Sequence, residues 1–368
     1  MFGIIALILT AQALAAPTVV KVAFVEALAP KDTTSSERFQ KDYDLAIAAG
    51  RRAMEKRLLS CGYTLEIETA FYDASDALQA RERGAEIERK GAWLIVGPRR
   101  SNHYILLTQG APQTPSVSLM ASASEVGALG ARHVSLSPLN ADMARAAAAE
   151  SKARVKKLKN QSYISIVSKD CATCVDFDLV FSNEAKKLGI KQSARIEVAG
   201  ESPDTSAIEA AVKTNAPAFI LLPNYSKVSS LMMSRLTGGK FFFVGGDGWG
   251  DANFGFVHES PGTSAAHGFS VRGYPPIEHG LNRLDRQILA QRELLPKGGP
   301  ALGILKSIDG LTEMLCRSRA KTQAAFAKTF EQQGRRIFAA PWGTSLYEIT
   351  NGGLSFKSTL KRSLVSGQ

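Results

Sequence analysis

The sequence predicts an α/β protein built from two similar lobes, each a Rossmann-like parallel sheet covered by helices. The chain has 368 residues, of which 45% are hydrophobic and 21% charged, and this suits a soluble protein of two domains. From Thr18 onward, short runs rich in β-branched and aromatic residues alternate with longer runs of helical spacing, which is typical of βαβ units. The alternation occurs twice, each time over about 120 residues, and therefore favours two lobes of one architecture.

The first half is expected to begin with a strand at 19–25 and a long helix at 43–59. In that helix Ala, Ile, Met and Leu recur at helical spacing, with Arg and Lys opposite, as in helices that cover a sheet. The polar segment 30–38 between them is expected as a loop. The other elements expected in this half are strands at 63–72, 93–96 and 116–120 and helices at 75–90 and 103–109.

The second half is expected to open with an alanine-rich helix at 140–155, which Asn140 or Asp142 is placed to cap. The strands expected after it lie at 163–167, 194–198, 218–222 and 241–244, and the helices at 177–188, 205–214 and 227–236. The tail then breaks the alternation, which predicts that it crosses back to the first lobe. Its expected elements are extended segments at 270–277 and 342–349, helices at 282–295, 303–319 and 322–333, and a hairpin around Gly352-Gly353.

The first 16 residues have the pattern of a cleaved secretory signal. Residues 2–14 are mostly apolar, and the A-x-A pattern at Ala13-Leu14-Ala15 precedes Ala16. The apolar run is shorter than the roughly 20 residues that a membrane span needs. No Lys or Arg precedes it, so either the start codon lies elsewhere or the amino terminus alone supplies the positive charge. We therefore expect a periplasmic protein cleaved near Ala16; a buried first strand or helix is the alternative.

Export permits disulfides, and the chain has four cysteines. Cys171 and Cys174 form a C-x-x-C motif between a strand-like and a helix-like run. A local structural disulfide is the favoured interpretation, and thiol exchange is the alternative. Cys61 and Cys316 either pair with each other or are both buried thiols. The five histidines are scattered and form no close cluster with the cysteines, so the sequence predicts no metal site and no cofactor.

The formal net charge of +11 raises the question of nucleic-acid binding. The basic pairs Arg99-Arg100, Lys156-Lys157 and Arg335-Arg336 are separate, and no nucleic-acid-binding motif accompanies them. The charge is therefore interpreted as a basic, well-solvated surface, with no nucleic acid as a partner.

The sequence also gives no sign of enzyme activity. The motifs of serine hydrolases, zinc peptidases and P-loop nucleotide enzymes are absent. Ser101 and His103 are two residues apart and rarely face each other at such spacing, and no orienting acid accompanies them. We therefore expect no catalytic residues.

Several short motifs follow one another in a set order along the chain. Gly97-Pro98-Arg99-Arg100-Ser101 ends a buried strand, Pro115-Ser116-Val117-Ser118 precedes small residues at 121–124, and glycines flank an acidic residue in 243–248. In this order they resemble the type I periplasmic solute-binding proteins, the group that contains the leucine/isoleucine/valine-binding proteins of ABC transporters. The resemblance covers nearly all of the chain after the signal. It implies two lobes joined by a multi-strand hinge, with residues 17–138 and 273–340 in lobe 1 and residues 139–272 and 341–368 in lobe 2.

The resemblance also implies a ligand site between the lobes. Serines that end strands or open helices in lobe 1 offer hydroxyl and backbone N–H groups to a carboxylate. An aspartate that follows a strand of the opposite lobe suits an ammonium group, and a tyrosine matches a position that covers the ligand in this family. Such ligands bind beyond the carboxyl ends of the strands. The predicted binding residues are Ser101, Ser118, Ala121, Ser122, Tyr225 and Asp247.

The expected function is that a monomer closes its lobes over a small amino-acid-like ligand and delivers it to the permease of an ABC transporter. A ligand sensor of the same fold and a lobe pair that serves in protein–protein contact are the alternatives. Two departures from the family pattern leave the ligand open. Cys171-Ala172-Thr173-Cys174 replaces the usual Tyr-Gly pair, which removes an aromatic wall, and Arg99-Arg100 adds positive charge that favours an anionic or more polar ligand.

Overall fold

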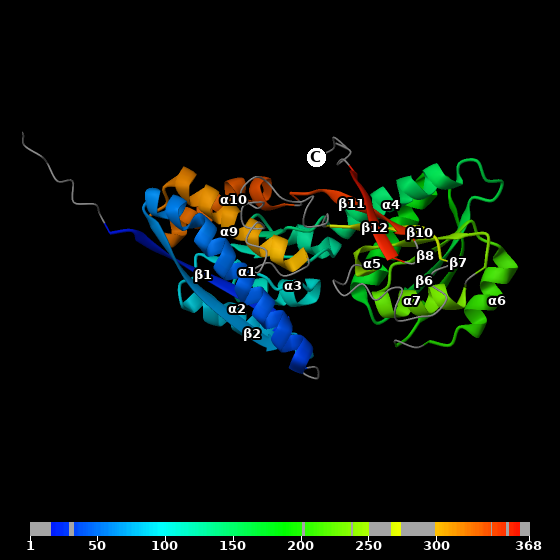
Figure 1. Ribbon diagram of the computed structural model, residues 1–368, viewed down its shortest axis with the longest axis horizontal. Helices are drawn as coiled ribbons and strands as arrows, with labels where there is room; N and C mark the ends of the chain where they lie inside the picture. The colour runs from blue at the N-terminus through cyan, green and yellow to red at the C-terminus, as the bar shows by residue number, and fades with distance from the viewer. Residues whose placement is uncertain are drawn as a thin grey trace, which may run out of the picture.

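The computed structural model describes residues 16–28, 33–200, 203–236, 238–249, 266–273, 299–339, 341–350 and 353–360. It contains two mostly parallel sheets with helices on both faces, in two lobes that lie next to each other (Figure 1). The two-lobed α/β architecture predicted from the sequence is thereby confirmed. The signal-like residues 1–15 and the helix expected at 282–295 lie outside the described residues.

The sheet of lobe 1 has five parallel strands in the order β2-β1-β3-β4-β5. Strand β1 is buried on both faces, because Val22 and Phe24 point into one helical layer and Ala23 and Val25 into the other. Burial on both faces is typical of parallel sheets. Helices α1, α9 and α10 form the first layer, and α2 and α3 the second. The elements are β1 (Thr18–Leu28), α1 (Thr33–Ser60), β2 (Tyr63–Asp73), α2 (Leu78–Arg89), β3 (Leu94–Val96), α3 (Ser101–Gly110), β4 (Ser116–Ser118), η1 (Ser124–Ala128), β5 (His133–Ser135), α9 (Gly299–Ser318) and α10 (Gln323–Phe338).

The sheet of lobe 2 repeats this strand order and extends it. Strands β7-β6-β8-β9-β10 are parallel, and β11 and β12 continue the sheet in antiparallel pairs. Tyr163 and Phe219 stack with ring centroids 5.1 Å apart on the face that α4 and α5 cover, whereas Ile164 and Ile220 point to α6 and α7. The elements are α4 (Asn140–Val155), β6 (Ser162–Ser168), α5 (Ala172–Lys187), β7 (Lys191–Val198), α6 (Ser206–Asn215), β8 (Phe219–Leu222), α7 (Ser226–Arg235), β9 (Phe242–Gly245), η2 (Asp247–Trp249), β10 (Gly268–Arg272), β11 (Thr344–Thr350) and β12 (Gly353–Leu360).

The chain crosses between the lobes repeatedly. It passes from β5 to α4, returns between β10 and α9, and passes again from α10 to β11. Each lobe therefore contains segments that are far apart in sequence. The residue limits given above for the two lobes stay a prediction.

Two helices begin five or more residues earlier than the sequence pattern predicts. Helix α1 starts at Thr33, so residues 33–38, which were expected in a loop, are helical. The apolar spacing that marks a helix begins only near Tyr43, and a turn of polar residues leaves no such mark. Helix α5 starts at Ala172 instead of 177, because the Cys171 Sγ occupies the N-cap position and accepts a hydrogen bond from the Cys174 N–H (3.2 Å).

The expected N-cap of α4 is wrong. Neither Asn140 nor Asp142 caps this helix, and the N-cap position belongs to Leu139, which makes no side-chain bond. The Asn140 amide instead donates to the Asp176 carboxylate (2.8 Å) and to the Thr173 carbonyl (3.1 Å). The Asn140 side chain, which the local sequence would assign to the helix cap, is thus used in a tertiary contact.

Two disulfides tie elements together. Cys61, which follows α1, is bonded to Cys316 in the last turn of α9, 255 residues away in sequence. Cys171 and Cys174 are bonded across the first turn of α5. The two bonds therefore close loops of very different length.

We predict that loss of the two disulfides affects stability unequally. Closure of a longer loop removes more entropy from the unfolded chain, so a Cys61→Ser/Cys316→Ser variant is expected to lose about 4–5 kcal/mol of unfolding free energy and a Cys171→Ala/Cys174→Ala variant about 2 kcal/mol. Urea unfolding of both variants and of the parent chain measures the difference. An equal loss in the two variants would contradict the prediction.

Three buried polar side chains form a hydrogen-bonded cluster in lobe 1. Ser116 Oγ shares hydrogen bonds with Tyr104 OH (2.8 Å) and His133 Nδ1 (2.9 Å), and Tyr104 OH also donates to the Val134 carbonyl (3.1 Å). Burial lowers the pKa of His133 from 6.5 to about 4, with a further lowering by Arg132. His133 is therefore neutral in the folded protein at neutral pH.

We predict that this histidine makes stability fall in mild acid. Between about pH 6.5 and pH 4 the unfolded chain binds a proton at His133 and the folded chain does not, so unfolding free energy falls as pH falls, by about 3 kcal/mol in total. His133→Asn keeps a hydrogen-bonding side chain without titrating, and its stability is expected to depend less on pH in this window. Thermal unfolding from pH 7 to pH 4 measures the slope, with His267→Asn, a change at an exposed histidine, as the control.

Candidate functional site

The lobe 1 side of the candidate site forms where β3 turns into α3. Gly97 follows β3 with φ +95° and lies so close to β1 that a Cβ there would come within 2.0 Å of the Val25 carbonyl oxygen. Only glycine fits such an approach in this backbone conformation. The turn then leads through Pro98 and Arg99 to Ser101, the first residue of α3.

Ser101 and Ser118 hold the loop that follows β4. Ser101 Oγ accepts hydrogen bonds from the backbone N–H groups of Ser122 and Ala123, both at 3.1 Å. Ser118 Oγ donates to the Pro98 carbonyl (2.7 Å) and accepts from the Ala121 N–H (3.0 Å). Both side chains are buried. Their hydroxyl oxygens therefore build the loop 121–124, and the Ala121 N–H, which was predicted to face a ligand, is taken up inside it.

The lobe 2 side is centred on Asp247. This residue follows β9 and begins the short helix η2, whose buried Trp249 donates from its indole N–H to the Leu222 carbonyl (2.8 Å). Burial raises the pKa of the Asp247 carboxyl, whereas the Ser122 hydroxyl and the Arg272 guanidinium lower it. The Ser122 hydroxyl donates to Asp247 Oδ2 at 2.9 Å. A single hydrogen bond thus joins the predicted residues of the two lobes.

A second carboxylate, Asp176, joins the lobes beside it. Asp176 Oδ2, in the second turn of α5, accepts from the Ser124 N–H (3.0 Å), the Ser124 hydroxyl (3.0 Å) and the Asn140 amide (2.8 Å). Asp176 is not among the binding residues predicted from the sequence. Its signal is weak, because a helical aspartate after a C-x-x-C motif resembles any solvated acidic residue until the tertiary fold brings Ser124 to it.

Tyr225 and Arg100 are exposed residues close to these contacts. Tyr225 is 58% exposed at the N-terminus of α7, and a Cβ on Gly248 would lie 3.3 Å from its ring. Burial of the Tyr225 hydroxyl raises its pKa and Asp247 raises it further, whereas Arg100, a hydrogen bond with the Thr173 side chain and Arg99 lower it. Arg100 is exposed and has no carboxylate partner within the described part of the chain. Its charge acts on the Tyr225 hydroxyl and on Glu26, but no described carboxylate forms an ion pair with it.

Arg99 has a different environment from Arg100. Its Nε lies 3.7 Å from Oε1 of Glu26, a fully buried carboxylate at the end of β1, and its guanidinium lies 4.3 Å above the Phe39 ring. The Arg99 backbone N–H also donates to Glu26 Oε2 (3.2 Å). Burial raises the pKa of Glu26, and Arg99 opposes that shift. Of the two arginines expected near the ligand, therefore, Arg99 is largely balanced and Arg100 is not.

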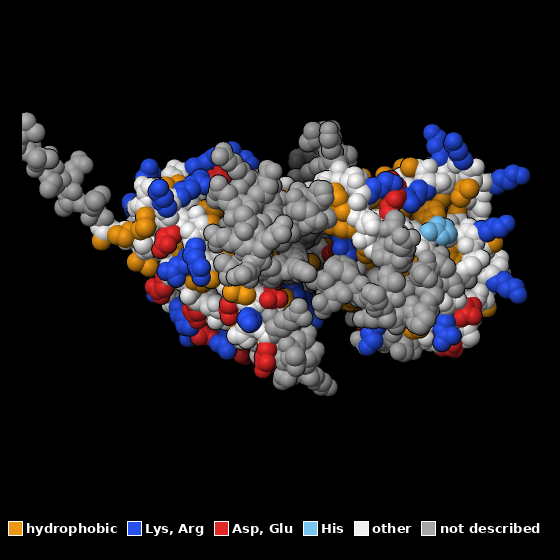
Figure 2. Space-filling model, viewed as in Figure 1, with side chains coloured by type: hydrophobic (Ala, Val, Ile, Leu, Met, Phe, Trp, Pro, Cys, Tyr) orange, Lys and Arg blue, Asp and Glu red, His pale blue; other side chains and the backbone are white. Residues whose placement is uncertain are grey.

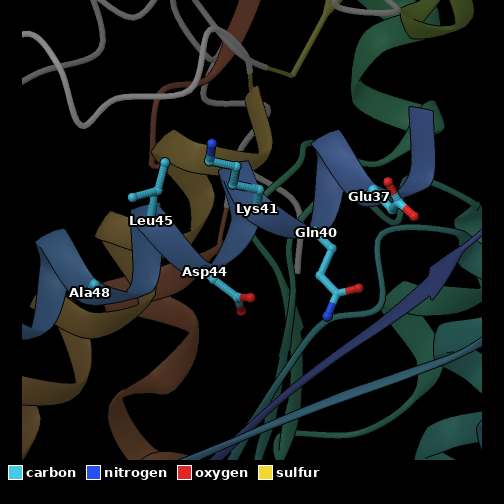
Figure 3. A pocket seen from close by; sticks show the side chains of 6 residues that line it. All are labelled: Glu37, Gln40, Lys41, Asp44, Leu45 and Ala48. Carbon is cyan, nitrogen blue, oxygen red and sulfur yellow. The ribbon is translucent and has the colours of Figure 1, made fainter. Parts of the chain in front are cut away.

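Two hollows on the surface of the described residues lie elsewhere. One of about 490 Å³ follows α1 and is lined by six side chains of this single helix, Glu37, Gln40, Lys41, Asp44, Leu45 and Ala48 (Figure 3). A second of about 450 Å³ continues it toward β2. Neither contains any of the six predicted binding residues. The described lining of these hollows lacks the serines and the aspartate that the sequence predicts for the site, so the region between the lobes is the better candidate.

The six predicted residues come together between the lobes. Hydrogen bonds link Ser101 to Ser122 and Ser118 to Ala121 within lobe 1. A further hydrogen bond links Ser122 to Asp247 of lobe 2, and the charge of Asp247 raises the pKa of Tyr225. The region therefore offers a cation in Arg100, an anion in Asp247 and an aromatic ring in Tyr225. This combination suits a small zwitterion or a small carboxylic acid. No group of three His, Cys, Asp or Glu side chains among the described residues is arranged to hold a metal ion.

We predict that the Ser122–Asp247 hydrogen bond favours lobe closure. A hydrogen bond to a charged group contributes about 1.5–3 kcal/mol, so Ser122→Ala is expected to shift the ligand-free protein toward a more open shape. Small-angle X-ray scattering should show a larger radius of gyration for this variant. Ser193→Ala is the matched control, because the Ser193 hydroxyl bonds only within lobe 2, to the Tyr163 carbonyl. An unchanged scattering curve for Ser122→Ala would contradict the prediction.

The chain resembles solved structures in its fold, whereas comparisons of its sequence give no match. No protein-family model matches it, and no curated protein matches it in sequence. A leucine-binding protein from Thermotoga maritima superposes with a TM-score of 0.71 at 16% identity, over 92% of this chain and 98% of that one. None of the helices in the described residues is both long and apolar enough to span a membrane.

Two further structures show the same likeness. A branched-chain amino acid transporter substrate-binding protein from Streptococcus pneumoniae, in complex with isoleucine, gives a TM-score of 0.66 at 14% identity, over 92% of this chain and 98% of that one. A solute-binding protein of an ABC transporter from R. palustris, in complex with benzoate, gives 0.64 at 13% identity, over 94% and 98%. The chain has the fold of the type I periplasmic solute-binding proteins.

Proposed function

We propose that the protein is an exported solute-binding protein that closes its two lobes over a small carboxylate-bearing ligand. The observation that carries the proposal is the direct contact of the Ser122 hydroxyl with Asp247, beside the open Arg100 and Tyr225. In open α/β sheets, ligands bind beyond the carboxyl ends of the strands. The serine loop follows β4 and Asp247 follows β9, so both lie at such ends.

The charges of the region support a carboxylate as the shared feature of the ligand. Arg100 has no carboxylate partner within the described part of the chain and lies near Tyr225. Arginine binds carboxylates through paired N–H donors. The Ser101 oxygen already accepts two hydrogen bonds, and no described residue accepts its O–H. That O–H is available as a second donor to the ligand.

Asp247 decides between two classes of carboxylate. The ammonium group of an amino acid would pair with the Asp247 carboxylate. Asp247 would then accept from both the ammonium group and the Ser122 hydroxyl. An aromatic acid has no such group and would leave Asp247 with Ser122 and Arg272. The structures of similar fold include complexes with isoleucine and with benzoate. We propose an amino acid, because its ammonium group would add an opposite charge next to the partly buried Asp247 carboxylate, which an aromatic acid does not supply.

In the cell, the protein is proposed to work as a periplasmic monomer that presents its ligand to the permease of an ABC transporter. The signal-like first 16 residues support export. Two lobes joined by crossing segments suit hinge closure. Uptake of labelled ligand in cells with and without the gene separates transport from sensing, since a sensor would leave uptake unchanged.

We predict that Asp247→Asn separates the two ligand classes. This change keeps the shape and removes the charge, so leucine or isoleucine is expected to bind about 30-fold more weakly, the equivalent of about 2 kcal/mol, while benzoate binding changes little. Arg100→Gln is expected to weaken both classes. Isothermal titration calorimetry of each variant measures the affinities.

Arg52→Gln is the matched control for Arg100→Gln, because it removes an exposed arginine on α1, away from the lobe interface. The proposal of a carboxylate ligand fails if no amino acid and no small aromatic acid gives a calorimetric or thermal-shift signal with the parent protein. The assignment of an amino acid fails if only aromatic acids bind.

A further inference from the structure

The end of lobe 2 that faces away from the strand ends of the candidate site is built from the loops that precede its parallel strands. Contacts between the loops show that they share one surface. The Lys191 N–H donates to the Gln161 carbonyl (3.0 Å), and the Lys152 ammonium donates to Gln161 Oε1 (2.7 Å). The Asn160 amide donates to the Ala216 carbonyl (2.7 Å) at the end of α6. We call this surface the lobe 2 pole.

Exposed cations crowd the lobe 2 pole. They come from the ends of α4, α5, α6 and α7 and from the starts of the strands that follow, and basic side chains gather at the outer end of lobe 2 in Figure 2. Glu184 pairs with Lys187 (2.9 Å), and none of the other cations has a carboxylate partner among the described residues. The cations are Lys156, Lys157, Lys159, Lys186, Lys187, Lys191, Lys213, Arg235 and Lys240, all of them exposed.

The corresponding end of lobe 1 carries fewer unpaired cations. Lys90, which precedes β3, pairs with Glu68 (2.7 Å) and Glu86 (2.9 Å), and Arg132, which precedes β5, pairs with Glu331. Arg89, Arg319 and Lys321 at the same end are exposed and form no ion pair among the described residues. The two lobes therefore differ in degree, and the larger group of cations without carboxylate partners lies at the lobe 2 pole.

Two exposed leucines lie among these lysines. Leu158, between Lys157 and Lys159, is 46% exposed, and Leu188, next to Lys187, is 37% exposed. Exposed apolar side chains within a basic surface are typical of proteins that bind the interface of an anionic bilayer, where the cations meet headgroups and the apolar side chains enter the acyl boundary. Specific protein interfaces have a different composition, since lysine is depleted from them.

We propose that the lobe 2 pole binds the surface of an anionic phospholipid bilayer. The occupant is a delocalised, planar anionic surface, because the cations project from four separate loops rather than converge on one point. The interaction is reversible and weakens with salt, since its attraction is largely electrostatic.

Flotation with vesicles tests the proposal. The purified protein is expected to bind vesicles of phosphatidylcholine with phosphatidylglycerol at low salt, and neither pure phosphatidylcholine vesicles nor mixed vesicles at high salt. Lysines near an anionic surface each add roughly fivefold to the affinity, so Lys156→Gln/Lys157→Gln/Lys159→Gln is expected to bind roughly a hundredfold more weakly. Leu158→Ser is expected to bind several-fold more weakly and to keep the salt dependence.

The matched control is Arg51→Gln/Arg52→Gln/Lys56→Gln, which removes the same charge from exposed positions on α1, and its vesicle binding is expected to stay unchanged. Thermal unfolding verifies that both triple variants fold. An equal loss of binding in the two triple variants would show that only total charge matters and overturn the proposal. Binding to polyglutamate without binding to the mixed vesicles would also overturn it, in favour of an acidic protein as partner.

Discussion

The loop 121–124 of lobe 1 is the part of the molecule on which the candidate site depends, because it carries the hydrogen bonds that meet lobe 2. Ser101 and Ser118 hold this loop from below, and Ser122 and Ser124 present their hydroxyls to Asp247 and Asp176. A carboxylate taken out of water needs compensating donors. Asp247 and Asp176 each accept a hydrogen bond from a serine of lobe 1. These two carboxylates of lobe 2 therefore have all of their donors only when lobe 1 is in contact.

The hydrogen bonds that join the lobes are weak compared with the packing inside each lobe. The Ser122–Asp247 bond joins the lobes directly, and the energy of one such bond is small compared with that of a packed core. The sheet of lobe 1, by contrast, is buried on both faces. In the proposed function, a ligand would therefore act on the contact between the lobes and not on the sheets.

The distribution of charge separates two surfaces of the protein. Near the candidate site, the carboxylates are matched by serine hydroxyls and arginines, as at Glu26 with Arg99 and Asp247 with Ser122 and Arg272. At the lobe 2 pole the lysines have few carboxylate partners among the described residues, whereas Lys90 and Arg132 at the corresponding end of lobe 1 are paired. The +11 charge that sequence alone attributes to a generally basic surface is therefore unevenly placed.

The sequence by itself determined the alternation of strands and helices and therefore the two-lobed α/β architecture, because apolar periodicity is a local property of the chain. Through the resemblance of its ordered motifs to a known family, the sequence also predicted the serine loop and Asp247 as a ligand site, at the edge where ligands of such sheets bind. It could not place the start of α1 at Thr33, because a turn of polar residues leaves no apolar pattern. Only the tertiary structure decided that Asn140 and Ser124 bond to Asp176, and that the lysines of four separate loops meet at one pole. These are contacts between residues far apart in sequence, and no local pattern encodes which distant side chain will supply the partner.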